Sequence, residues 1–127
     1  MIVGSDLQSL AELKRRPGLF GNRAVFTARE RAHCEGRRDP WASLGGILCA
    51  KEAFIKALSA FEDLPPLTFL DLEIRHAENG RPLLHPGERL GRWLSRRRLA
   101  VDVSISHSGE YATATVLIGK KRATRGA

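Results

Sequence analysis

The sequence lacks long hydrophobic runs and is poor in cysteine. No apolar stretch approaches the roughly 18 to 20 residues that a membrane-spanning helix needs. The N-terminal segment Met1–Gly4 lacks the basic and apolar regions of a signal peptide. Cys34 and Cys49 do not have the spacing of metal ligands, so we expect free thiols. Together these absences predict a cytoplasmic protein with no membrane segment.

Aromatic residues are also scarce, at 6% of the chain, and there is no internal repeat, low-complexity segment or recognised nucleic-acid motif. The chain is nevertheless basic, with 21 Lys and Arg against 14 Asp and Glu and a net charge of +7. This charge predicts an acidic partner, which is a nucleic acid, an anionic membrane, or an acidic protein or phosphorylated substrate. Because aromatics are few, a nucleic-acid-binding module is only the alternative function. A basic surface that merely aids solubility requires no partner.

Hydrophobic residues make up 43% of the 127 positions, which is enough for one core. Apolar alternation predicts short strands at 1–4, 69–74, 83–84, 101–105 and 111–118. Helical spacing predicts helices at 7–15, 27–34, 43–61 and 86–99. The predicted fold class is therefore α+β, with a small antiparallel sheet packed against a long central helix. One domain is expected at 1–118, followed by a basic tail at 119–127.

The central helix carries the most informative pattern. Glu52 and Lys56 lie one helical turn apart, and the simplest interpretation is an ion pair on a solvated face, worth about 0.2–0.5 kcal/mol. Elsewhere, Asp6 follows a strand, where Asp is most often a helix N-cap. Thr27 and Glu30 have the spacing of a capping box, which by itself accounts for both residues.

The run Lys-Glu-Ala-Phe-Ile-Lys-Ala-Leu at 51–58 resembles the signature of the 4′-phosphopantetheinyl transferases, and most of all their short bacterial form, the holo-acyl-carrier-protein synthases. Two further segments resemble the same family in the same order. They are apolar-apolar-Gly-x-Asp-apolar at 2–7 and Val-Ser-Ile-Ser-His-Ser at 103–108. The resemblance thus covers both ends and the middle of the chain.

This resemblance implies that 4′-phosphopantetheine is transferred from coenzyme A to a serine of an apo acyl carrier protein, with release of 3′,5′-ADP. It implies Mg²⁺ held by Asp6 and Glu52, which together with Lys56 form the expected catalytic set. Either Glu52 or a water molecule would accept the serine proton. The residues expected to contact coenzyme A are Lys51, Lys56, Gly80, Pro82, Ser106 and His107.

The resemblance also implies partners. Family members of this length are α+β units that assemble as homotrimers, with sites between neighbouring chains. An acidic carrier protein would dock on the basic cluster near the end of the first helix, which consists of Lys14, Arg15, Arg16 and Arg23. The alternative for this cluster is a solvated helix end that complements the helix dipole.

Two positions depart from the family pattern. Ser9 stands where the family usually has Glu, and Ile47 stands where it usually has Arg. These departures leave open a catalytically impaired member that binds carrier protein or coenzyme A without turnover. Ile47 is either an altered anchor that faces the site or simply a core residue.

Overall fold

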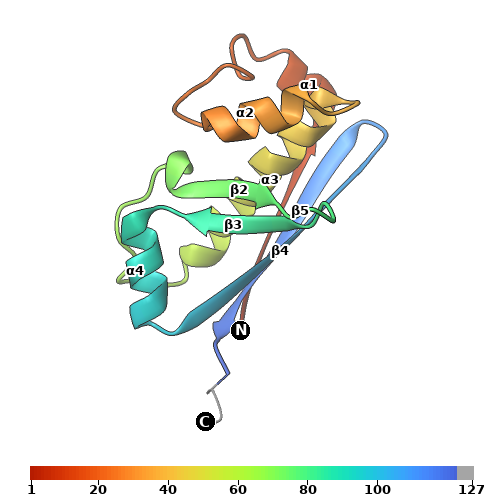
Figure 1. Ribbon diagram of the computed structural model, residues 1–127. Coiled ribbons are helices and arrows are strands. Elements are labelled where there is room, and N and C mark those ends of the chain that lie inside the picture. Colours follow the sequence, from red (N-terminus) through yellow and green to blue (C-terminus); the bar gives the residue numbers. More distant parts are fainter. Residues whose placement is uncertain (123–127) are drawn as a thin grey trace.

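The computed structural model describes residues 1–122, in which four helices pack against two antiparallel sheets (Figure 1). The helices are α1 (Leu10–Lys14), α2 (Ala28–Glu35), α3 (Pro40–Leu58) and α4 (Glu88–Arg96), with a short 3-10 helix η1 (Phe69–Asp71). The strands are β1 (Ile2–Ser9), β2 (Leu72–His76), β3 (Pro82–Pro86), β4 (Leu99–Ser108) and β5 (Tyr111–Lys120). This architecture confirms the predicted α+β class. Within residues 1–122, no helix combines the length and apolar character needed to span a bilayer.

The larger sheet has the strand order β1–β5–β4, and α3 packs on one of its faces. β5 is the central strand and pairs with β1 over the whole of Ile2–Ser9 and with β4 over the whole of Leu99–Ser108. β2 and β3 form a separate hairpin that crosses α3 (Figure 1). Helix α4 follows β3 at the open end of this hairpin. β1 and β4 are therefore the two edges of the larger sheet.

Helix α3 begins where the sequence supplies both an N-cap residue and a proline that favours the first helical position. The Asp39 carboxylate accepts a hydrogen bond from the Ala42 amide at 3.1 Å, and Pro40 occupies the first helical position. The helix is buried along most of its length, as expected for an element that contacts both sheets.

Two glycines allow α3 to lie unusually close to the sheet. A Cβ on Gly4 of β1 would lie 2.1 Å from the carbonyl oxygen of Ala53. A Cβ on Gly46 of α3 would lie 2.6 Å from Cγ2 of Ile105 in β4. No side chain fits at either distance, so the glycines fix which turn of α3 faces which strand.

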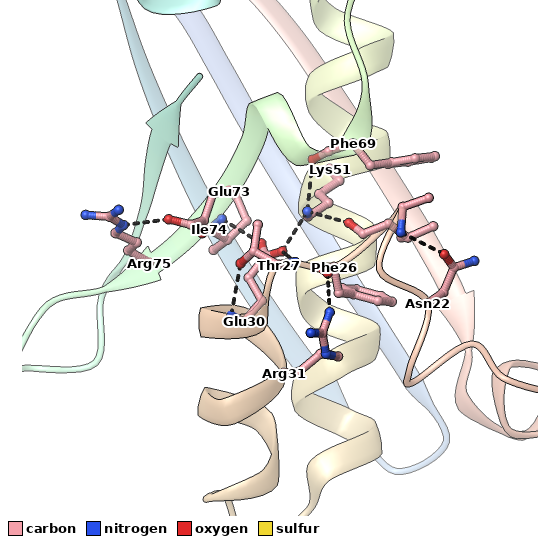
Figure 2. A network of polar contacts seen from close by, with 12 residues as sticks. Asn22, Phe26, Thr27, Glu30, Arg31, Lys51, Phe69, Glu73, Ile74 and Arg75 are labelled. Atoms are coloured by element: carbon pink, nitrogen blue, oxygen red, sulfur yellow. Dashed lines mark hydrogen bonds and ion pairs between the residues drawn. The ribbon is translucent and has the colours of Figure 1, made fainter. Parts of the chain in front are cut away.

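A buried ion pair joins α3 to α2 (Figure 2). Lys51 Nζ lies 2.7 Å from Glu30 Oε1, and both side chains are fully buried. The same ammonium donates to the carbonyl of Val25 at 2.7 Å and to that of Phe69 at 2.9 Å. Burial lowers the pKa of Lys51, and the hydrogen bond and charge of Glu30 offset part of that effect.

Glu30 completes the network from the other side. Its Oε1 accepts from the Thr27 amide at 2.9 Å and its backbone amide donates to Thr27 Oγ1 at 3.1 Å, so the predicted capping box is confirmed. Capping is only part of its role, because Oε2 accepts from the amide of Ile74 in β2 at 2.8 Å. Four segments, α2, α3, β2 and η1, thus meet at one ion pair.

The predicted first helix is wrong at its start. The apolar spacing of Leu7, Leu10 and Leu13 suggested a helix over 7–15, but β1 continues to Ser9 and α1 is only Leu10–Lys14. Pairing with β5 outweighs the helical spacing, since Leu7 lies opposite Thr113. Ser9 then caps α1 by accepting from the Glu12 amide at 3.3 Å.

The predicted strand over 69–74 also begins too early. Phe69–Asp71 forms η1, because the Asp71 carboxylate accepts from the Thr68 amide at 2.8 Å and closes a tight turn. Leu70 consequently stays 42% exposed, whereas Leu72 and Ile74 are buried as expected. At the other end of the chain, β5 continues to Lys120, two residues into the predicted tail, and 123–127 lie outside the described residues.

Two further expectations concern single positions. Ile47, at 1% exposure, belongs to the hydrophobic core and faces no site, so the core alternative holds. Cys34 and Cys49 are free, as predicted, and both are buried. Leu90, Trp93 and Leu94 are the buried residues of α4.

The buried ion pair gives the first testable prediction. Lys51→Met leaves the Glu30 carboxylate buried without a counter-ion, and we expect the free energy of unfolding to fall by about 3–5 kcal/mol in urea titrations at pH 7. The double variant Glu30→Gln, Lys51→Met leaves no buried charge and should recover part of that loss. Lys56→Met is the control, because it removes a half-exposed ammonium and should cost at most about 1 kcal/mol. Equal losses for the two lysine variants would contradict a structural role for the pair.

Candidate active site

The first group of predicted site residues meets at the edge strand β1. Lys56 Nζ of α3 lies 3.0 Å from Asp6 Oδ1 and also donates to the carbonyl of Ser5 at 3.0 Å. The second carboxylate oxygen of Asp6 accepts from the side chain of Gln8 at 2.8 Å. The Asp6 side chain is only 11% exposed, while Lys56 is 56% exposed. Strand β1 thus holds a largely buried carboxylate against a cation from α3.

Glu52 lies on the side of α3 that faces Asp6. Cys49, Glu52 and Lys56 follow one another at three- and four-residue spacings and share a helix face. Both neighbours of Glu52 on that face approach Asp6. Lys56 does so through its ion pair, and Cys49 has its pKa raised to about 12, first by burial and then by the Asp6 charge. Helical geometry therefore directs the partly buried Glu52 towards the same part of β1.

The expected ion pair between Glu52 and Lys56 is absent. Lys56 pairs with Asp6 instead, and Glu52 forms no ion pair among residues 1–122. The half-exposed ammonium of Lys56 shows that positive charge is favoured beside Asp6. No group of three or more His, Cys, Asp or Glu side chains within the described chain could hold a metal. The two carboxylates fit Mg²⁺, which binds hard oxygen ligands, and needs few protein ligands because waters and phosphates complete its shell.

The second group of predicted residues lies at the opposite edge strand, β4. Gly80, Pro82 and His107 line one cavity of about 160 Å³, with Gly80 and Pro82 at the β2–β3 turn and His107 near the end of β4. His107 is a strand residue rather than part of the turn, since it pairs with Ala112. That these residues contact coenzyme A stays a prediction.

Lys51, which was expected beside the nucleotide, lies in the core, whereas the contact expected of Ser106 stays a prediction. Lys51 is fully buried, and its polar contacts within residues 1–122 are with Glu30 and backbone carbonyls, so it is corrected from a phosphate ligand to a core residue. Ser106 precedes His107 in β4 and therefore points to the other face of the sheet, away from the cavity. Successive side chains of a strand point to opposite faces of the sheet. The motif did not indicate whether Ser106 or His107 faces the cavity.

Sequence reasoning missed three nitrogen-bearing side chains that line the cavity. They are His33 of α2, Arg37 just after α2 and His76 of β2. His33 and His76 are far apart in the sequence and neither belongs to a recognised motif. Only the packing of α2 against β2 brings them together, so no signal in the sequence marks them.

The basic cluster of Lys14, Arg15, Arg16 and Arg23 is exposed at the end of α1 and in the loop that follows. None of these four side chains forms an ion pair with another residue of the described part of the chain. Their charge is therefore available to a partner.

Comparison with known proteins identifies the family. The model of the 4′-phosphopantetheinyl transferase superfamily matches residues 2–116. The chain belongs to this superfamily. The match includes β1 with Asp6, α3 with Glu52 and Lys56, and β4 with His107.

Two relatives of the chain carry the same name. The holo-[acyl-carrier-protein] synthase of Moorella thermoacetica is 38% identical over 123 residues, covering 91% of each protein. That of Protochlamydia amoebophila is 33% identical over 116 residues, covering 88% of this chain and 92% of the relative. Such matches make the chain an enzyme of the holo-acyl-carrier-protein synthase type, as the three sequence segments predicted.

Solved structures of this transferase type share the fold. A Chronobacterium ammoniagenes ACPS–CoA complex superposes with a TM-score of 0.77 at 34% identity, covering 95% of this chain and 98% of the other. The Neisseria meningitidis synthase superposes with a TM-score of 0.78 at 27% identity, covering 94% and 100%. The fold seen here is therefore that of the superfamily over nearly its full length.

Proposed function

We propose that this transferase moves 4′-phosphopantetheine from coenzyme A to a serine of an acidic acyl carrier protein and releases 3′,5′-ADP. The observation that carries the proposal is the meeting of Asp6 and the Glu52–Lys56 face of α3 at one edge of the sheet. The relatives named holo-[acyl-carrier-protein] synthase, and the relative solved with coenzyme A, support the substrate pair. The two free thiols favour a cytoplasmic location.

The chemistry is a phosphoryl transfer in which the protein mainly positions the reactants and neutralises charge. The serine oxygen of the carrier forms a bond to the phosphorus that bears pantetheine. The bond between that phosphorus and the bridging oxygen breaks, and 3′,5′-ADP leaves with the electron pair. The serine proton passes to Glu52 or to a water molecule beside it. Lys56, half exposed next to Asp6, is placed to offset the charge of the leaving group.

Magnesium fits the carboxylate pair and would be held by Asp6 and Glu52, with the remaining positions left to water and phosphate oxygens. When bound, the ion supplies charge neutralisation on the pyrophosphate. Asp6 is oriented for this role by Gln8 and by β1 pairing, and α3 orients Glu52. Removing the metal with a chelator is expected to abolish transfer and to leave the fold intact.

A homotrimer is the proposed assembly, and the positions of the two groups support a shared site. Asp6 lies on edge strand β1 and His107 on edge strand β4, with β5 between them, so the edges are roughly 10 Å apart. Helix α3 packs between the two groups, since its residues contact Gly4 on one edge and Ile105 on the other. The proposed assembly places the β4 edge of a neighbouring chain beside the carboxylates of each chain.

The face of the larger sheet that points away from α3 suits such a contact. It carries exposed apolar side chains on neighbouring strands: Val3 is 60% exposed, Leu7 63%, Tyr111 52% and Leu117 40%. Val3 and Leu117 lie directly opposite each other. An uncovered apolar sheet face of this kind is typical of a subunit interface.

The assay that tests the proposed function is mass spectrometry of an apo acyl carrier protein after incubation with this protein, coenzyme A and Mg²⁺. We expect the carrier to gain one phosphopantetheine group. Binding of coenzyme A or carrier without any mass gain would instead identify a catalytically impaired member.

Glu52→Gln is the sharpest variant, because it removes a charge with little change in volume. If Glu52 holds the metal, turnover should fall by about 100-fold or more. Asp6→Asn should behave alike, and the double variant should be little worse than either single one, since both carboxylates serve one ion. Glu62→Gln, an exposed glutamate just beyond α3, is the matched control and should retain parental turnover. Near-parental transfer by Glu52→Gln would refute the metal assignment.

Carrier docking is proposed to depend on the exposed basic cluster of Lys14, Arg15, Arg16 and Arg23. Reversing Lys14 and Arg15 to Glu should raise the KM for the carrier about tenfold, mainly through slower association, and leave coenzyme A binding nearly unchanged. The control reverses Arg89 and Arg96 on α4, which are equally exposed. An unchanged carrier KM in the first variant would remove the cluster from the docking surface.

The assembly is tested on the uncovered sheet face. Leu7→Glu places a charge on that face, and light scattering is expected to show a loss of the oligomer together with a loss of transfer activity. Leu83→Glu is the control, because Leu83 is 45% exposed but lies on the β2–β3 hairpin. A stable Leu7→Glu monomer with full activity would contradict a site shared between chains.

A further inference from the structure

The cavity beside β4 contains a pair of stacked histidines. The rings of His33 and His76 lie parallel, with an interplanar angle of 5° and centroids 3.8 Å apart. His33 comes from α2 and His76 from β2, and both are partly buried. The position of α2 against β2 is fixed by the hydrogen bond from Ile74 to Glu30. The two rings are therefore held together by the fold and not by a flexible loop.

Further groups that can carry positive charge line the cavity with this pair. Arg37 and His107 line the same cavity of about 160 Å³, together with Ser43 of α3. An adjoining hollow is lined by Arg37, Arg38 and His107, and its one acidic residue, Asp39, is engaged in capping α3. The cavity is smaller than the roughly 300 Å³ at which sites for whole drug-sized ligands begin, so it suits one group of a ligand.

We propose that His33, His76, Arg37 and His107 form a phosphate-binding subsite in which binding takes up a proton. This inference rests on the proposed function, because the phosphate belongs to coenzyme A, as either its 3′-phosphate or its pyrophosphate. A permanently charged guanidinium and several imidazole N–H groups are donors that match phosphate oxygens. Ile47, at the position where the family usually has Arg, lies in the core, and Arg37 supplies a guanidinium to the cavity from another segment.

The proton linkage follows from the surroundings of the two rings. In the free protein, burial lowers the pKa of His76 to about 4, with further lowering by His33 and Arg37. Burial and then Arg37 lower the pKa of His33 as well. Both imidazoles are thus mainly in the neutral form at pH 7. A bound phosphate brings negative charge to the pair and raises the pKa of at least one ring.

The sign of the pH dependence is fixed by this change. The ring binds a proton more tightly in the complex than in the free protein, so affinity increases as the pH falls. The affinity increases at most tenfold per pH unit for one proton. It stops increasing below the pKa that the ring has in the free protein. A site built only from Arg and Lys has no side chain that would take up a proton above pH 6.

The experiment is calorimetric titration of the intact protein with coenzyme A at pH 6 and pH 8, and at pH 7 in two buffers of different ionisation heat. The comparison is with the double variant His33→Gln, His76→Gln. Because the phosphates of coenzyme A also titrate, the difference in proton uptake between the parent and the double variant is the quantity that counts. We expect the parent to take up more protons and to lose affinity more steeply between pH 6 and pH 8. His85→Gln, an exposed histidine of β3 outside the cavity, should behave like the parent.

Dephospho-coenzyme A identifies the phosphate. If the extra proton uptake disappears with this ligand, the cavity binds the 3′-phosphate, and if it remains, the cavity binds the pyrophosphate. Equal proton uptake and equal pH dependence in the parent and the double variant would overturn the inference while leaving the proposed function intact. Failure of the parent to bind coenzyme A at any pH would overturn the proposed function itself.

A second measurement avoids any folding defect of the double variant. Histidine ring resonances of the unaltered protein are followed by NMR through a pH titration with and without coenzyme A. We expect the apparent pKa of the stacked pair to rise when coenzyme A is bound and the ring resonances of His85 to be unaffected by the ligand. Unchanged titration of the stacked pair would contradict the subsite.

Discussion

The buried ion pair between Lys51 and Glu30 is the constraint on which the rest of the structure depends. A desolvated ammonium and carboxylate are costly unless every oxygen and proton has a partner. Here the further partners come from the loop before α2, from η1 and from β2. Few arrangements of these segments satisfy both charges at once. The pair therefore favours one packing of α2 and the β2–β3 hairpin against α3 more strongly than apolar contacts alone would.

The same pair determines what the neighbouring residue does. Successive residues of a helix point in directions about 100° apart, so a Lys51 directed into the core turns Glu52 towards β1. Gly4 then brings β1 close enough for Asp6 to meet the Lys56 side of α3. The pair of carboxylates at the sheet edge, Asp6 and Glu52, and the hydrophobic core are thus two consequences of one orientation of α3. Lys51 is unavailable to a ligand for this reason.

The net charge of +7 is distributed over groups with different physical properties. The cluster on α1 is exposed and permanently charged, which suits long-range attraction of an acidic protein. The cavity at β4 combines Arg37 with imidazoles whose pKa values are low, so its charge depends on what occupies it. Lys51 contributes its charge to the core alone. Composition alone could not separate these three roles.

The sequence by itself determined the α+β class, the central helix with its Glu52 and Lys56 pattern, the capping box at Thr27 and the family. These are local or ordered patterns, and each depends on residues whose spacing in the chain equals their spacing in an element. Sequence reasoning placed the end of β1 and the start of β2 wrongly, because strand pairing and a side-chain cap outweighed apolar spacing there.

Only the tertiary structure decided the fate of Lys51, Ile47 and Ser106 and brought His33 to His76. Whether a helical residue points into the core or towards a site depends on which neighbours pack on each face, and the spacing along the chain is the same in both cases. The stacked histidines come from elements far apart in the sequence, and the packing of α2 on β2 places them together. Contacts of this kind depend on the whole fold, since no short segment contains both partners.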